Sequence, residues 1–228
     1  MKISKLTDHL KFEHANISIP STRDEPQLNI EQKQTCLVLL ASKPLGRAML
    51  KLLPNRETTL VILCGEDKAL RDCQPQFSSD LTQAKTIAGL LGILDDVVNC
   101  ICSAVAKMET QLKAVYISNI SMFYWDLQVS TDENYEQLGF HAYVPQSNIF
   151  HKLSALLKQI ALKYRCPVMV VGYDSTFDSG IAAPKHYSSS EIQKYSKLPT
   201  SFLESFDHLI HRTASKVEVF DKEQNRWT

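Results

Sequence analysis

Residues 41–48, with the sequence ASKPLGRA, stand where a phosphate-binding loop would follow the first apolar run of the chain. Such loops read G-x-x-x-x-G-K-[ST], because backbone N–H groups and the lysine hold phosphates while the hydroxyl holds magnesium. Here Ala41 replaces the first glycine, Arg47 the lysine and Ala48 the hydroxyl residue. Pro44 also removes one backbone donor. The segment therefore predicts a decayed ATP site, or else a chance match of one glycine and one basic residue.

A second test concerns the acidic residue that would hold magnesium through water at the end of a buried strand. The apolar run 114–117 ends in Ser118 and Asn119, so this position carries no carboxylate. The two segments together predict no catalytic residues, no cofactor and no metal ligands.

Other groups with acid–base chemistry are scattered. His208 and His211 lie on a predicted strand, where an odd offset places their rings on opposite faces. Asp174 and Asp178 follow another predicted strand, a position suited to acid–base work, but no partner base or nucleophile stands beside them in the sequence. We expect ordinary surface or packed histidines and a solvated loop for the two aspartates.

The elements that must position these residues are indicated by apolar patterns. Short continuous runs predict strands buried on both faces of a parallel sheet, and spacing of three and four residues predicts helices. The expected strands cover 36–40, 58–64, 114–117 and 168–171, with closing strands at 206–211 and 216–220; the expected helices cover 45–53, 81–108 and 149–164. Strands separated by helices predict an α/β fold, a mainly parallel sheet with ligands at the carboxyl ends of the strands.

Two regions are expected along the chain. Residues 1–34 are polar and interrupted by Pro20 and Pro26, which predicts an N-terminal arm that packs locally at best. Residues 35–228 form the predicted core domain. Between 174 and 200 the chain is polar and lacks periodicity, and this length favours a functional segment.

Composition narrows the function classes. Lys plus Arg and Asp plus Glu both number 25, so any site for nucleic acid must be a local patch. Cys36, Cys64 and Cys166 lie in or beside apolar runs, and no C-x-x-C pair is present. Neither an apolar leader nor a stretch of about 18 apolar residues occurs, which predicts a reducing, intracellular location without membrane contact.

Residues 115–125, with the sequence VYISNISMFYW, resemble the corresponding strand and turn of the eukaryotic RecA-family recombinase paralogues. Three further stretches, 42–52, 173–181 and 196–212, support the likeness in the same order along the chain. Within this group the similarity is greatest to the Shu-complex branch of fungi. The family normally has an acidic residue where Ser118 stands, so the likeness extends to the fold but not to its magnesium site.

The resemblance implies a RecA-like fold of the P-loop NTPase type with a degenerate nucleotide site. It further implies a nuclear accessory factor that helps assemble the recombinase filament on single-stranded or forked DNA. Such a factor works as a heterodimer with another degenerate RecA-like paralogue, within a larger complex. The family places DNA contacts in the loop after the fourth core strand, which corresponds to residues 174–200 here.

That segment carries cations and aromatic rings in alternation. Phosphates attract cations and unpaired bases stack on aromatic rings, so the expected DNA-binding residues are Lys185, His186, Tyr187, Lys194, Tyr195 and Lys197. The acidic residues Asp174, Asp178 and Glu191 weaken the patch, and lysines in a polar loop also serve solubility alone. Two other functions remain open: an ATP-binding paralogue with an unusual site, and a scaffold that contacts protein only.

Overall fold

The computed structural model describes residues 16–20, 28–53, 59–63, 98, 101–103, 105–106, 112–123, 146–174 and 190–228. Its centre is a seven-stranded sheet in the order β4-β5-β6-β3-β7-β8-β9. The strands are β3 (Thr35–Leu40), β4 (Thr59–Leu63), β5 (Ala114–Ser118), β6 (Val168–Tyr173), β7 (His208–Arg212), β8 (Val217–Asp221) and β9 (Arg226–Trp227). The first five are parallel to one another, while β8 and β9 continue the sheet in antiparallel pairing.

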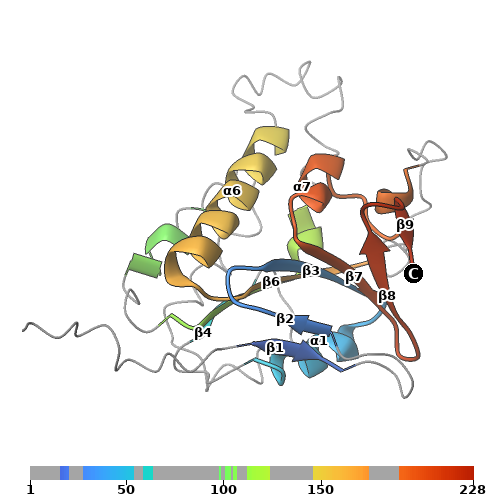
Figure 1. Ribbon diagram of the computed structural model, residues 1–228, viewed down its shortest axis with the longest axis horizontal. Helices are drawn as coiled ribbons and strands as arrows, with labels where there is room; N and C mark the ends of the chain where they lie inside the picture. The colour runs from blue at the N-terminus through green and yellow to red at the C-terminus, as the bar shows by residue number, and fades with distance from the viewer. Residues whose placement is uncertain are drawn as a thin grey trace, which may run out of the picture.

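Helical elements cover one face of the sheet. These are η5 (Ile120–Phe123), α6 (Gln146–Tyr164), η7 (Glu191–Gln193) and α7 (Thr200–Glu204). The other face carries α1 (Lys43–Leu50) and a two-stranded ribbon of β1 (Ile17–Ile19) and β2 (Leu28–Ile30), as Figure 1 shows. The predicted α/β class with a mainly parallel sheet flanked by helices is therefore confirmed.

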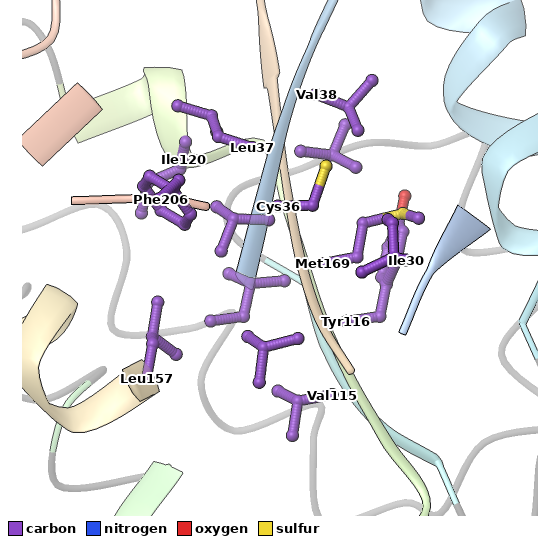
Figure 2. Packing of buried hydrophobic residues seen from close by; sticks show 14 of the residues in the cluster. Ile30, Cys36, Leu37, Val38, Val115, Tyr116, Ile120, Leu157, Met169 and Phe206 are labelled. Carbon is purple, nitrogen blue, oxygen red and sulfur yellow. The ribbon is translucent and has the colours of Figure 1, made fainter. Parts of the chain in front are cut away.

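The central strands are apolar along their whole length because both faces of the sheet are covered. All six residues of β3 and of β6 are buried. In Figure 2, Leu37 points to the side of Ile120 and Phe206, and its neighbour Cys36 points to the side of Met169 and Ile30. Successive side chains alternate across the sheet, so each strand contributes to two hydrophobic layers.

The longest helix, α6, follows the predicted spacing. Its buried residues recur every three or four positions, which places them on one face: Phe150, Leu153, Leu157, Ile160 and Ala161. Phe150 packs edge-on against Phe202 of α7 at 4.8 Å between ring centroids. The helix ends at a left-handed Arg165 with φ of 50°, and Pro167 prevents its continuation.

The N-terminal segment differs from its prediction. Ile17, Ile19 and Ile30 are fully buried in the same hydrophobic cluster as the sheet, so β1 and β2 pack on the core. The alternation Ile-Ser-Ile in β1 presents two isoleucines to one face, which explains this burial. The boundary at residue 34 stays a prediction. Of the predicted helix at 81–108, only residues 98, 101–103 and 105–106 are described, and these are helical.

Candidate nucleic-acid interface

The turn between β3 and α1 contains only Ala41 and Ser42, because α1 begins at Lys43. A phosphate-binding loop keeps its intervening residues out of the helix so that their N–H groups converge on phosphate. Here Gly46, which would close that loop, lies inside α1. Leu45 already donates its N–H to the carbonyl of Ser42 at 3.3 Å. The chain thus builds a helix where a phosphate cradle would be.

A side chain also occupies the space beside Gly46. The phenol oxygen of Tyr173 lies 3.2 Å from the position that a Cβ at Gly46 would take, and Leu40 lies 3.8 Å away. Tyr173 ends β6, the neighbour of β3, so its ring closes the corner between strand and helix. Because Gly46 has no Cβ, it lets the Tyr173 ring pack closely against α1, and this packing explains the glycine without phosphate binding.

Ser118, at the predicted position for a magnesium ligand, ends β5 and is 2% exposed. Its hydroxyl has no hydrogen-bond partner among the described residues. A buried neutral hydroxyl cannot supply the charge that a hard cation requires from a carboxylate. Three residues later, Ser121 is also buried, but its hydroxyl accepts from the N–H of Tyr173 at 2.8 Å and donates to the carbonyl of Tyr173 at 2.9 Å.

A buried polar network lies at the carboxyl edge of the sheet, at the base of the predicted DNA-binding segment. His211 of β7 is 4% exposed, with Nε2 2.9 Å from Oδ2 of Asp174 and Nδ1 3.4 Å from Oε2 of Glu218. Lys216 pairs with the other oxygen of Glu218 at 2.9 Å. Both ring nitrogens of His211 therefore lie beside a carboxylate oxygen.

This network corrects the expectation for Asp174. The aspartate is 2% exposed and directly faces a histidine, so it neither lies in a solvated loop nor lacks a partner base. Its backbone N–H donates to the carbonyl of Leu40, which fixes it beside β3. Asp178 lies outside the described residues. The prediction that His208 and His211 face opposite sides is confirmed, since they occupy positions of β7 opposite Cys36 and Leu39 of β3.

Aromatic rings extend the network toward η7 and β9. The ring of Tyr195 stacks on His211 at 3.6 Å between centroids with an interplanar angle of 8°, and its hydroxyl donates to Glu218 at 2.9 Å. Trp227 meets Tyr195 edge-on at 5.0 Å and donates from Nε1 to the carbonyl of Glu191 at 2.8 Å. The C-terminal part of the predicted loop, at Glu191 and Tyr195, is thereby attached to β7, β8 and β9.

The pKa of Glu218 reflects these contacts. Burial raises it, but hydrogen bonds from Lys216, Tyr195 and His211 together outweigh burial and lower the pKa below the usual value. Three donors therefore hold the carboxylate in its charged form. Without such donors, burial would favour the neutral acid.

The described part of the predicted DNA-binding set has mixed exposure. Lys194 is exposed, with Nζ 4.9 Å from the centroid of the Tyr195 ring. A hydrogen bond with Tyr195 is the largest cause that raises the pKa of Lys194; desolvation opposes it, and the charges of Glu218 and Glu191 add to the rise. Tyr195 is half-buried, and the ring face that meets His211 is closed to a base. Lys197 is half-buried as well. The remaining residues, Lys185, His186 and Tyr187, lie outside the described ranges, and DNA contact by this set stays a prediction.

Two of the three described cysteines behave as small hydrophobic residues, while Cys102 is exposed. Cys36 and Cys166 are buried free thiols, and burial raises the pKa of Cys166 to about 12. Cys64 is outside the described residues. Within the described ranges no three side chains of His, Cys, Asp or Glu are placed to hold a metal ion. Nor does any helix in this part of the chain have the length and apolarity needed to cross a bilayer.

Sequence reasoning missed Glu218 and Trp227 as members of the network. The alternation in β8 could have placed Glu218 beside a β7 residue, because His211 and Glu218 are direct antiparallel partners. Trp227 belongs to a strand of two residues, which is too short to leave a periodic signal.

These features define the class of the protein: an α/β domain with a mainly parallel sheet, in which a helix begins where a phosphate-binding loop would follow β3. A family model described as "Shu complex component Psy3, DNA-binding description" matches residues 1–215. The chain belongs to this family of Shu complex components, and the predicted kinship with the Shu-complex branch, specifically its platinum-sensitivity subunit, is confirmed. It is accordingly an accessory subunit in recombinational DNA repair, and part of a multi-subunit complex.

Solved structures show distant similarity. A KaiC-like protein, PH0186 of Pyrococcus horikoshii OT3, is 11% identical with a TM-score of 0.42, over 83% of this chain and 78% of that one. The RadB recombinase is 12% identical with a TM-score of 0.42, over 80% and 75%. The ADP conformation of MJ1267, an ATP-binding cassette of an ABC transporter, is 8% identical with a TM-score of 0.44, over 93% and 91%. No curated protein matches the chain.

Proposed function

We propose that this chain is a non-enzymatic subunit that binds single-stranded or forked DNA and promotes assembly of the recombinase filament. It acts in the nucleus as a heterodimer with another degenerate RecA-like paralogue. Membership of the DNA-binding Shu component family supports the DNA-binding part of the proposal. Its non-enzymatic part is carried by the start of α1 at Lys43, which leaves no loop to cradle phosphate.

Residues 174–200 are the proposed DNA contact, through Lys185, His186, Tyr187, Lys194, Tyr195 and Lys197. The contacts at the two ends of this segment support the assignment. Asp174 at one end is held by His211, and Tyr195 near the other end is held by Glu218. Two anchored ends reduce the conformational entropy that the segment would lose on binding DNA. The expected contacts are electrostatic and independent of sequence.

The test replaces Lys185, Lys194 and Lys197 together by Ala and measures DNA binding of the assembled complex by fluorescence anisotropy across a salt series. Because each lost phosphate contact lowers the salt slope by about 0.7 on single strands, we expect a slope reduced by about two and an affinity at least tenfold weaker. Unchanged affinity and slope would remove the segment from DNA binding and favour a protein-only scaffold.

A control variant replaces two lysines that lie outside the proposed DNA contact. Lys33 and Lys51 are exposed lysines in the turn before β3 and at the end of α1. Their replacement by Ala should leave the salt slope of the complex unchanged, since neither lies in the proposed DNA contact. A control that weakens binding as much as the loop variant would show that overall charge alone is responsible.

A further inference from the structure

His211 contacts residues near both ends of the segment proposed to bind DNA. Its Nε2 lies 2.9 Å from Oδ2 of Asp174, the first residue of that segment. Its ring stacks on the ring of Tyr195, near the other end, with 3.6 Å between centroids. Residues 175–194 lie between these two contacts in the sequence. A single side chain of β7 therefore joins the start of the segment to its end.

The order of the strands explains how one side chain reaches both places. β3 pairs with β6 on one side and with β7 on the other, and His211 is the β7 partner of Leu39. Asp174 follows β6, and its backbone N–H donates to the carbonyl of Leu40 at 3.0 Å. The aspartate is thereby placed beside β3, at the carboxyl edge of the sheet, where it meets the imidazole from the next strand.

The contact with Tyr195 is reinforced through a shared carboxylate. Oε2 of Glu218 lies 3.4 Å from Nδ1 of His211 and accepts from the hydroxyl of Tyr195 at 2.9 Å. His211, Asp174 and Glu218 are all buried, so water does not readily replace a contact that one of them loses. Tyr195 is thus held both by ring stacking and through Glu218.

The residues around Tyr195 include an exposed cation of the proposed DNA contact. Lys194 directly follows η7, and its Nζ lies 4.9 Å from the centroid of the Tyr195 ring. At the start of η7, the carbonyl of Glu191 accepts from Nε1 of Trp227 at 2.8 Å. Because η7 is attached at its first residue and just beyond its last, the position of Lys194 depends on the ring that stacks on His211.

His208 shows how a second histidine of the same strand differs. It is half-buried on the opposite face of the sheet, and its Nε2 has no hydrogen-bond partner among the described residues. His211, by contrast, uses two nitrogens and a ring face to contact residues beside β6, on β8 and beside η7. This set of contacts connects separate parts of the chain, which is more than the packing of a histidine in the core requires.

The energetic role of such a connection is to reduce the entropy lost on binding. A segment whose ends are already fixed loses less conformational freedom when it is ordered on DNA. The number of phosphates that its cations neutralise sets the salt dependence of binding and does not depend on that freedom. Loss of the connection should therefore weaken affinity and leave the salt slope unchanged.

We propose that His211 is a positioning residue for DNA binding: it joins Asp174 to Tyr195 and so sets the separation of the two ends of the segment. His211 itself is buried and acts through these two residues, without contact to DNA. This inference rests on the proposed function, in which residues 174–200 contact DNA.

The test replaces His211 by Leu in the assembled complex and measures the affinity for single-stranded DNA by fluorescence anisotropy across a salt series. We expect about tenfold weaker binding with an unchanged salt slope, because the ends are released while the phosphate contacts are retained. The matched control, His208→Leu, makes the same change on the opposite face of the same strand and should leave the affinity unchanged.

A second variant keeps part of the connection. His211→Gln retains a side-chain N–H that can donate to Asp174 but loses the aromatic stack on Tyr195. We expect it to bind about threefold more weakly than the wild type, again with an unchanged slope. This variant decides the question where His211→Leu does not assemble with its partner chain.

Hydrogen exchange of the complex without DNA separates positioning from a general loss of stability. In the His211 variants we expect faster exchange at residues 190–198, with β3 and β5 unchanged. Faster exchange throughout the sheet, together with a smaller fraction of complex that binds DNA in a stoichiometric titration, would show that His211 only stabilises the fold.

The lysine variant of the proposed function distinguishes the remaining outcomes. Unchanged affinity in the His211 variants, while replacement of Lys185, Lys194 and Lys197 weakens binding, would refute the positioning role and leave the DNA contact standing. A reduced salt slope in His211→Leu would also overturn the inference, because it would mean that phosphate contacts are lost. Insensitivity of the wild-type complex to those three lysines would instead refute the proposed function.

Discussion

Two serines near the end of β5 differ in what their hydroxyls do. Ser118 is buried and its hydroxyl has no partner among the described residues, whereas Ser121 accepts from and donates to the backbone of Tyr173. An unpaired buried hydroxyl opposes folding because it loses its hydration without replacement. A paired one fixes η5 against β6, and Gly172 permits the approach, since a Cβ there would lie 2.6 Å from Oγ of Ser121.

We therefore predict opposite effects of two similar substitutions. Ser118→Ala should raise the free energy of unfolding by up to about 1 kcal/mol, because it deletes an unsatisfied group. Ser121→Ala should lower it by about 2 kcal/mol, because it deprives Tyr173 of a donor and an acceptor. Urea denaturation of both variants measures this difference, and equal losses of stability would mean that Ser118 makes a hydrogen bond of comparable worth.

For single residues, the sequence predicted the loss of ligand groups but did not predict the buried contact between Asp174 and His211. The sequence alone shows that the expected phosphate and magnesium ligands are replaced at Arg47, Ala48 and Ser118, because a motif specifies chemical groups at fixed spacing. The contact between Asp174 and His211 is not visible, because 37 residues separate them and only the placement of β3 between β6 and β7 brings them together.

The hairpin of β7 and β8 is the element that holds the polar network. Glu218 faces His211 directly across the strands, and Lys216 and Tyr195 complete its hydrogen bonds. Since the pKa of Glu218 is lower in the folded chain, its stabilising effect is fully present above the ordinary carboxyl pKa of about 4. That effect is lost as the pH falls through the lowered value.

The corresponding prediction concerns acid stability. The free energy of unfolding of the wild type should fall between about pH 5 and pH 3, and Glu218→Gln should flatten this part of the profile. Chemical denaturation at a series of pH values measures it, with Asp221→Asn as a control carboxyl on the same strand. An equal slope in the wild type and Glu218→Gln would show that other carboxylates cause the acid sensitivity.

Most elements could be predicted because burial on two faces or on one face leaves a pattern. The runs that became β3, β4, β5 and β6 were of this kind, and so was α6. Three-residue β1 and β2 and two-residue β9 carry too few positions for a period, and their place is set by tertiary packing. The pairing of β7 with β3 also depends on the whole sheet, because it is a parallel contact across a long crossover.

At the scale of the whole molecule, the start of α1 at Lys43, which leaves no phosphate-binding loop after β3, predicts that nucleotide does not change the stability of the chain. Any ligand that binds only the folded chain raises its melting temperature, by an amount that grows with its concentration over Kd. We expect ATP with magnesium at millimolar concentration to shift the melting temperature of the complex by less than about 1 °C. Differential scanning fluorimetry with and without EDTA tests this, and a magnesium-dependent rise of several degrees would restore the ATP-binding alternative.

The early start of α1 at Lys43 has a kinetic consequence. Proteins that hydrolyse nucleotide can use hydrolysis to leave a bound conformation, so the hydrolysis rate limits how long they stay on a partner. Under the proposed function no hydrolysis step limits how long this chain stays bound. Its residence on DNA is then an ordinary dissociation rate, governed by salt and by its partner subunit, and its occupancy follows the amounts of complex and DNA rather than the ratio of ATP to ADP.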